Sequence, residues 1–169
     1  LDPAAAARME PTNRRRVVRA LEVTLGSGRP FSSFGPGLDA FSPSPVHMVG
    51  LWLPRPVVAA RIEARYHHQL ADGFLDEVRA LAAGPGVSRT AAQALGYREL
   101  LAHVAADARG EPHPTLDEAV EQAVSRTRQF ARRQRVWFRR DPRITWVGAA
   151  HDPLVALDAL LDEAATVWP

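Results

Sequence analysis

The stretch SRTRQFARRQRVWFRR, residues 125–140, carries seven arginines in sixteen positions, and the interpretation of the chain starts from it. At 100° per residue, its apolar side chains fall on one face of a helix that we expect to begin near Thr115. That face holds Val120, Ala123, Val124, Phe130, Ala131, Trp137 and Phe138. The arginines occupy the remaining arc. We therefore predict a long amphipathic helix with a buried apolar face and a dense cationic surface.

The cationic surface has two interpretations. A solvated polar face is typical of most charged helices. However, no Asp or Glu lies between Glu121 and Asp141, so this helix cannot neutralise its charge through i,i+4 pairs. Seven like charges on one helix favour a polyanionic partner, because guanidinium groups match the geometry of phosphate.

Composition excludes several classes of protein. All 21 basic residues are arginine, so a phosphate-binding GxxxxGK[ST] motif, which needs lysine, is absent. There is no cysteine, which excludes disulfides and thiol catalysis and favours a cytoplasmic protein. We find no membrane-spanning run and no signal peptide. The six histidines lack metal-ligand spacing, so we predict no metal site built by this chain alone.

Hydrophobic periodicity and cap residues predict an α/β fold that is predominantly helical. Helices are expected at residues 3–9, 14–26, 56–83, 91–106, 115–140 and 152–168. Asp2, Asn13 and Thr115 are the expected N-caps of the first, second and fifth, and Glu118 has the spacing of a capping box with Thr115. Gly26 and Gly28 should end the second, Gly73 is a candidate break in the third, and Gly96 lies inside the fourth. Buried strands are expected at residues 46–53 and 144–147, joined in a parallel sheet whose other strands are missing. Residues 29–45 are expected to form a loop or linker.

Two arginines in the third predicted helix form a candidate anion site. Arg61 and Arg65 are four residues apart, and such a pair can grip a phosphate or diphosphate. The alternative is that both pair with surface acids such as Glu63 and Asp76.

Five segments together resemble the bacterial tRNA dimethylallyltransferases, also called tRNA isopentenyl-diphosphate transferases. The segments are DPAAAAR (2–8), RRVVRALEV (15–23), RIEARYHHQL (61–70), AQALGYREL (92–100) and SRTRQFARRQRVWFRRDPRITWV (125–147). The resemblance covers nearly the whole chain and is weakest at residues 29–45 and 105–114.

The resemblance implies a function and a fold. Such enzymes transfer a dimethylallyl group from dimethylallyl diphosphate to the exocyclic amino group of an adenosine beside the tRNA anticodon, with Mg²⁺ as cofactor. They have a P-loop nucleotide-kinase-like core and a helical insertion that grips the anticodon stem-loop. Residues 1–45 would then be the remainder of the insertion, and residues 46–169 the C-terminal part of the core. We expect the full-length protein to be a monomer.

The resemblance also implies site residues. Arg65 would contact the diphosphate. The tRNA-binding residues would be Arg8, Met9, Pro11, Thr12, Arg16, Gly86, Val87, Ser88, Arg89, Thr90, Ala91, Ser125, Arg126, Thr127, Arg128, Gln129, Arg132 and Arg133. Arg19 would add a phosphate contact.

Two departures from the family pattern bear on these expectations. Glu10-Pro11-Thr12-Asn13 replaces the usual His-Pro-Asn-Asp, which places a carboxylate near RNA phosphate. The P-loop, its magnesium-binding hydroxyl and the aspartate that acts as general base would all lie upstream, so we expect this chain to be inactive alone. The alternative is an RNA-binding module without chemistry, descended from such an enzyme. A DNA-binding regulator is a more distant alternative, because no dimer interface or recognition helix is apparent.

Overall fold

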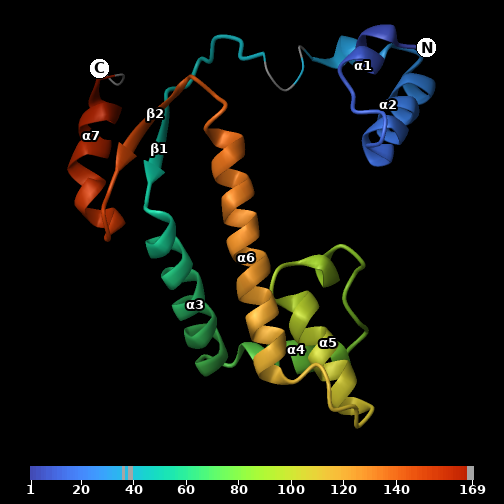
Figure 1. Cartoon of the computed structure of the whole chain (residues 1–169), viewed down its shortest axis with the longest axis vertical. Coiled ribbons are helices and arrows are strands. Elements are labelled where there is room, and N and C mark those ends of the chain that lie inside the picture. Colours follow the sequence, from blue (N-terminus) through green and yellow to red (C-terminus); the bar gives the residue numbers. More distant parts are fainter. Residues whose placement is uncertain (36, 38–39, 167–169) are drawn as a thin grey trace. The chain divides into compact units, whose positions relative to one another are not determined.

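The structure is a computed structural model that describes the chain except for residues 36, 38–39 and 167–169 (Figure 1). The chain forms two compact units. Leu1–Val46 and Arg140–Arg143 make up the first unit, and the second contains His47–Arg139 and the chain from Ile144 onward. The assignment of residues 1–45 to an insertion and 46–169 to a catalytic core stays a prediction.

The second unit combines helices with a small parallel sheet. Its strands, β1 (Met48–Trp52) and β2 (Ile144–Gly148), pair in parallel, with Met48 opposite Ile144 and Trp52 opposite Gly148. Its helices are α3 (Arg55–Ala71), α4 (Phe74–Ala83), α5 (Tyr97–Ala108), α6 (Leu116–Phe138) and α7 (Leu157–Ala165). Short 3₁₀ turns, η2 (Ala91–Gln93) and η3 (Pro153–Ala156), precede α5 and α7. The α/β, predominantly helical character is therefore confirmed.

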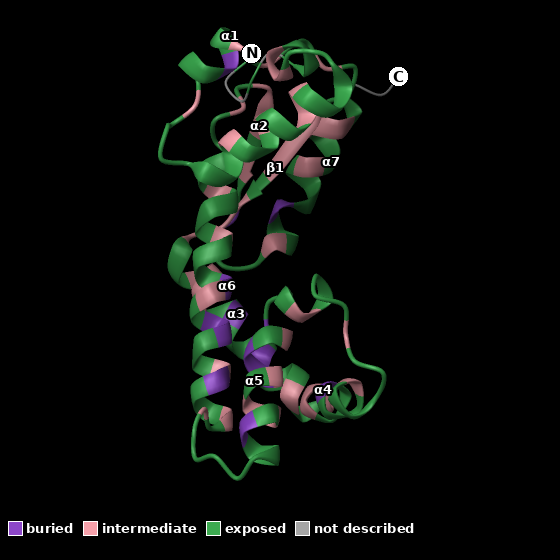
Figure 2. Cartoon of the chain, turned by 90° about the vertical axis from the view of Figure 1, so that its right-hand side faces the viewer, coloured by how far each residue is buried: buried purple, intermediate pink, exposed green. Residues whose placement is uncertain are grey.

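The core of this unit lies along α6. One cluster joins Ile62 and Tyr66 of α3 to Ala123 and Val124 of α6, and a second joins Val78, Leu100 and Ala119 from α4, α5 and α6. Figure 2 shows these buried residues in purple on α3, α5 and α6. Since α6 contributes to both clusters, it connects the α4–α5 pair to α3.

Local capping explains where α6 begins. The Thr115 hydroxyl accepts the Glu118 backbone N–H at 3.3 Å, and the Glu118 carboxylate accepts the Thr115 backbone N–H at 2.8 Å. This is the predicted capping box. His113 also contacts the Glu118 carboxylate at 2.8 Å, and these contacts, that of His113 first, lower the pKa of Glu118 below its ordinary value.

The predicted apolar face of α6 is only half buried. Its N-terminal half buries Ala119, Ala123, Val124 and Thr127. In its C-terminal half, Phe130, Trp137 and Phe138 are 42%, 50% and 48% exposed. The expectation of a continuous buried face was therefore wrong, because α3 and α5 pack mainly against the first half of the helix.

Glycines with positive φ change two predicted helices. Gly73, at φ +93°, separates α3 from α4, which confirms it as the break. Gly96, at φ +88°, lies at the N-cap of α5, so the prediction of a helix beginning at Ala91 with Gly96 inside it was wrong. A Cβ on Gly96 would lie 3.2 Å from the rings of Phe74 and Tyr66.

Other boundaries also differ from expectation. β1 spans Met48–Trp52, is half-buried rather than buried, and exposes Leu51, since only two strands are found in the described chain. The last helix begins at Leu157, after η3, rather than at Asp152. The expected end of that helix, Trp168, lies outside the described residues. Within the described chain, no helix combines the length and apolar character needed to cross a bilayer.

The first unit contains α1 (Pro3–Ala7), α2 (Arg14–Ser27) and the 3₁₀ turn η1 (Phe31–Phe34), which lies within the expected linker. Asp2 caps α1, as predicted, by accepting the Ala5 N–H at 3.0 Å, and it also accepts the Ser32 N–H at 2.7 Å. These hydrogen bonds, that from Ser32 first, lower the pKa of the Asp2 carboxyl. Helix α2 runs through Gly26, so Gly28 alone, with φ +68°, ends it.

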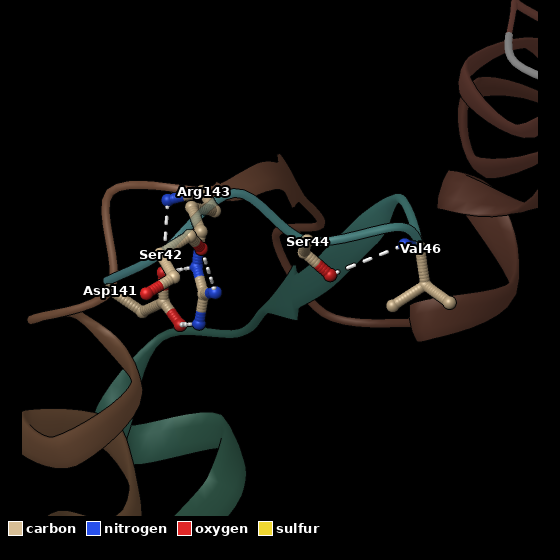
Figure 3. Close-up of polar contacts among 5 residues, drawn as sticks. All are labelled: Ser42, Ser44, Val46, Asp141 and Arg143. Atoms are coloured by element: carbon tan, nitrogen blue, oxygen red, sulfur yellow. Dashed lines mark hydrogen bonds and ion pairs between the residues drawn. The ribbon is translucent and has the colours of Figure 1, made fainter. Parts of the chain in front are cut away.

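An arginine connects two separate segments of the first unit. Arg143 donates to both carboxylate oxygens of Asp141, at 2.8 and 2.6 Å, and to the backbone carbonyl of Ser42 at 2.6 Å (Figure 3). Its guanidinium also lies 5.4 Å from the centre of the Phe41 ring. The side-chain hydrogen bond from Arg143 lowers the pKa of the Asp141 carboxyl.

We predict that Gly96→Ala destabilises the protein more than Gly86→Ala. Gly86 has a similar φ of +85° but open space at its Cβ position. An alanine at positive φ is strained in either variant. Gly96→Ala should lose at least about 1 kcal/mol more, because its methyl group meets two aromatic rings. Urea unfolding of both variants measures the difference, and equal losses would contradict the packing described for Gly96.

Candidate functional site

The basic stretch of α6 is partly neutralised by acids on other helices. Arg126 lies 3.2 Å from the carboxylate of Glu99 on α5, and Arg128 lies 2.6 Å from that of Glu63 on α3. Sequence reasoning missed both partners, because it searched for acids within the helix. Glu63 was considered as a partner for Arg61 and Arg65. Neither of these arginines has a side-chain hydrogen bond or ion pair in the part of the chain that the structure describes.

Two further arginines are engaged near the end of α6. The guanidinium carbon of Arg135 lies 3.0 Å from the centre of the Trp52 ring, and that of Arg139 lies 5.1 Å from it. Burial and the neighbouring cations Arg55 and Arg139 lower the pKa of Arg135. These arginines attach the C-terminal half of α6 to β1 through cation–π contacts.

Arg132 and Arg133 carry the least compensated charge of the stretch. Both are exposed, and neither forms an ion pair with an acid in the described chain. Arg133 lies only at the outer limit of a cation–π contact, 6.0 Å from the Phe130 ring. Of the sequence-predicted residues on this helix, Ser125 and Gln129 are also exposed, whereas Thr127 is buried.

Arg65 lines an open cavity of about 610 Å³ whose walls come from helices α3 to α6 and from the end of the α4–α5 loop. Its other lining residues are Ile62, Tyr66, Gln69, Asp72, Phe74, Glu77, Leu95, Tyr97, Thr127, Phe130, Ala131 and Gln134. Arg61, one turn earlier on α3, is not among them. The walls therefore combine one cation, Arg65, and two carboxylates, Asp72 and Glu77, with aromatic and amide side chains. Arg65 is the group of this cavity that can contact an anion.

Tyrosines on two helices hold the polar groups of this cavity. The Thr127 hydroxyl donates to the Ala123 carbonyl at 2.8 Å, so the Tyr66 hydroxyl, 2.9 Å away, acts as the donor to Thr127. The Tyr97 hydroxyl donates to Glu77 at 2.6 Å, and this hydrogen bond raises the pKa of Tyr97. The Tyr97 ring meets that of Phe74 edge-on at 5.0 Å.

The loop between α4 and α5 contributes to the same region. Of its predicted site residues, Gly86, Ser88, Arg89, Thr90 and Ala91 are exposed and Val87 is half-buried. The Ser88 hydroxyl accepts the Ala91 backbone N–H at 3.1 Å, which shapes the turn into η2. Leu95, near the end of the loop, lines the cavity together with Thr127 and Phe130 of α6.

The remaining predicted residues lie in the first unit. Arg8, Pro11, Thr12 and Arg16 are exposed and Met9 is half-buried, all at or between α1 and α2. Arg19 is 3.3 Å from Glu22. Among the described residues, no three His, Asp or Glu side chains come together as metal ligands would.

Comparison with known proteins shows similarity along the whole chain. Residues 1–141 match the family model described as IPP transferase. A tRNA dimethylallyltransferase of Nocardioides sp. (strain ATCC BAA-499 / JS614) is 44% identical over 168 residues, covering 99% of this chain and 50% of that protein. One from Thermobifida fusca (strain YX) is 46% identical over 148 residues, covering 87% and 44%. The chain thus spans about half the length of these curated relatives.

Solved structures give the same result. The tRNA delta(2)-isopentenylpyrophosphate transferase of Staphylococcus epidermidis matches with a TM-score of 0.62 and 26% identity, covering 98% of this chain and 53% of that one. The full-length tRNA isopentenylpyrophosphate transferase of Bacillus halodurans matches with a TM-score of 0.60 and 29% identity, covering 96% and 49%.

We predict that Tyr66 and Thr127 are energetically coupled. Tyr66→Phe should cost about 1 kcal/mol, the usual worth of a buried hydrogen bond. In a Thr127→Val background the same change should cost almost nothing, since the tyrosine hydroxyl has already lost its acceptor. Unfolding free energies of the four proteins give the coupling, and an equal cost of Tyr66→Phe in both backgrounds would contradict it.

Proposed function

The chain belongs to the IPP transferase family, and we propose that it supplies the RNA-binding surface and one wall of the diphosphate site of a tRNA dimethylallyltransferase. In the proposed reaction, the amino nitrogen of an adenosine beside the anticodon bonds to C1 of the dimethylallyl group. The C1–O bond breaks, its electron pair leaves with diphosphate, and the amino group loses a proton. The observation that carries the proposal is an exposed arginine surface on α6 next to a cavity that Arg65 lines.

The RNA surface centres on the middle of α6. Arg132 and Arg133 face no acid in the described chain, so their charge is available to backbone phosphates. Arg126 and Arg128 each share their charge with a carboxylate and supply guanidinium donors to RNA at lower net charge. The RNA surface also includes neutral contacts from Ser125, Gln129 and the loop of residues 86–91. Arg89 in that loop adds a further cation.

The first unit supplies a second group of RNA contacts. Arg8, Met9, Pro11, Thr12, Arg16 and Arg19 are assigned to it. Arg16 is in the first turn of α2, where a cation opposes the helix dipole, which supports a role beyond stability. Glu10 lies in the same segment and limits how closely phosphate approaches there.

Arg65 is proposed to act on the leaving group. As the C1–O bond breaks, negative charge accumulates on the diphosphate, and a neighbouring guanidinium stabilises that charge more than it stabilises the bound substrate. The aromatic side chains of the cavity, such as Phe130, supply apolar wall surface in the same space. Mg²⁺ would supply further neutralisation of the diphosphate, but the described residues do not fit a metal site, so no step here depends on the ion.

The RNA surface is tested by an Arg132→Gln/Arg133→Gln double variant. We expect it to bind an unmodified anticodon stem-loop more weakly, with the slope of log K against log salt reduced by about 1.5, because two phosphate contacts are lost. A matched Arg79→Gln/Arg109→Gln variant removes the same charge from exposed arginines that pair with Asp76 and Glu111. Equal weakening by both variants would mean that net charge alone governs binding, and absence of binding by the folded wild-type chain would overturn the RNA surface.

The diphosphate site is tested by titrating inorganic diphosphate into the chain. Arg65→Gln should weaken binding about tenfold, as loss of one charged contact does. Arg61→Gln is the matched control, because Arg61 is on the same helix but outside the cavity. Calorimetry measures both affinities. Equal losses, or no effect of Arg65→Gln, would remove Arg65 from the site.

A further inference from the structure

Glu99 is a buried carboxylate with no role in the function proposed above. It lies in the first turn of α5 and is 2% exposed. Glutamate is seldom buried to this extent unless it is paired, because removing its charge from water is costly. The contacts of Glu99 therefore show which parts of the structure compensate for the free-energy cost of burying its charge.

The two oxygens of Glu99 bind two different segments. Oε2 accepts the backbone N–H of Gly96 at 3.0 Å, and so holds the left-handed turn that ends the α4–α5 loop. Oε1 lies 3.2 Å from Nη1 of Arg126 on α6, an ion pair that lacks hydrogen-bond geometry. A single side chain thus joins the end of the loop to the basic helix.

The Gly96 turn also contacts α3, in addition to α5 and its Glu99 side chain. The Gly96 backbone packs against the ring of Tyr66 on α3, and Tyr66 in turn donates a hydrogen bond to Thr127, the neighbour of Arg126. The turn, the basic helix and α3 are therefore held by one continuous cluster of polar and aromatic contacts. Glu99 is the side chain of this cluster that contacts both Arg126 and the end of the loop.

We propose that Glu99 is a positioning residue for RNA binding, acting through Arg126 and the loop that precedes Gly96. This inference rests on the proposed RNA surface. The ion pair with Glu99 joins Nη1 of Arg126 to the carboxylate, and the Arg126 side chain keeps 35% of its surface exposed. A guanidinium group has five N–H donors, and the ion pair with Glu99 holds the Arg126 charge in place while leaving these donors available to RNA. The other oxygen of the same carboxylate holds Gly96, where the chain leaves the α4–α5 loop and enters α5.

Charge and positioning predict opposite effects of removing the carboxylate. Glu99→Gln deletes a negative charge beside a surface that binds a polyanion, so electrostatics alone predicts tighter RNA binding. Under the positioning role, Arg126 loses its anchor and binding weakens. Glutamine retains an oxygen that can accept the Gly96 N–H, which makes it the mildest variant for stability.

The experiment measures stem-loop affinity across a salt titration for Glu99→Gln, Arg126→Gln and the double variant. Asp76→Asn is the matched control, since Asp76 forms an exposed ion pair with Arg79 on α4. We expect both single variants to weaken binding about tenfold, and the double variant to match Arg126→Gln, because residues that act through one contact are not additive. Asp76→Asn should leave the affinity unchanged or slightly increase it.

Backbone hydrogen exchange at Gly96 and in the loop provides a second measurement that does not depend on RNA. Faster exchange there in Glu99→Gln, with protection elsewhere unchanged, is expected, because the neutral amide oxygen accepts the Gly96 N–H more weakly than the carboxylate does. Unchanged or tighter binding by a folded Glu99→Gln variant would overturn the positioning role and leave the RNA surface intact. Absence of stem-loop binding by the wild-type chain would overturn the RNA surface instead. In that case, unchanged hydrogen exchange in Glu99→Gln would also reject the structural role of Glu99.

Discussion

The packing of the first half of α6 against α3 and α5 is the constraint on which the second unit depends. Small residues, Ala119 and Ala123, lie on this part of the helix and are fully or almost fully buried. Small side chains permit close approach of neighbouring helices, so Tyr66 and Leu100 can fill the space between them. The same contacts place Arg126 and Arg128 beside acids on those helices. Packing and charge compensation therefore arise from one arrangement.

That arrangement divides six of the seven arginines of residues 125–140 into three groups. Arg126 and Arg128 pair with carboxylates from other helices, Arg135 and Arg139 stack on Trp52, and Arg132 and Arg133 face no acid in the described chain. The first group stabilises helix contacts, and the second attaches the helix end to the sheet. The third retains a charge that a polyanion can use. Arginines that look equivalent in the sequence thus have different roles, which depend on the residues that surround each of them.

Glu99 and the Gly96 turn connect the structural and binding roles. A left-handed residue with rings on one side of its backbone can only be glycine without strain. The N–H of that glycine is satisfied by a carboxylate whose other oxygen meets Arg126. The geometry of the loop and that of the basic helix are consequently set by the same side chain, which explains why a buried charge is accommodated at this point.

The sequence by itself determined the features that depend on neighbours along the chain. These include the capping box of Thr115, the caps at Asp2 and Asn13, the break at Gly73 and the helical character of the molecule, because local hydrogen bonds and φ preferences decide them. The family resemblance was likewise readable from its motifs. Only the tertiary structure decided which half of α6 is buried and which acids neutralise its arginines. It also placed Gly96 at a helix start and Arg65, rather than Arg61, on the cavity wall. These outcomes depend on contacts between segments distant in sequence, for which periodicity carries no information.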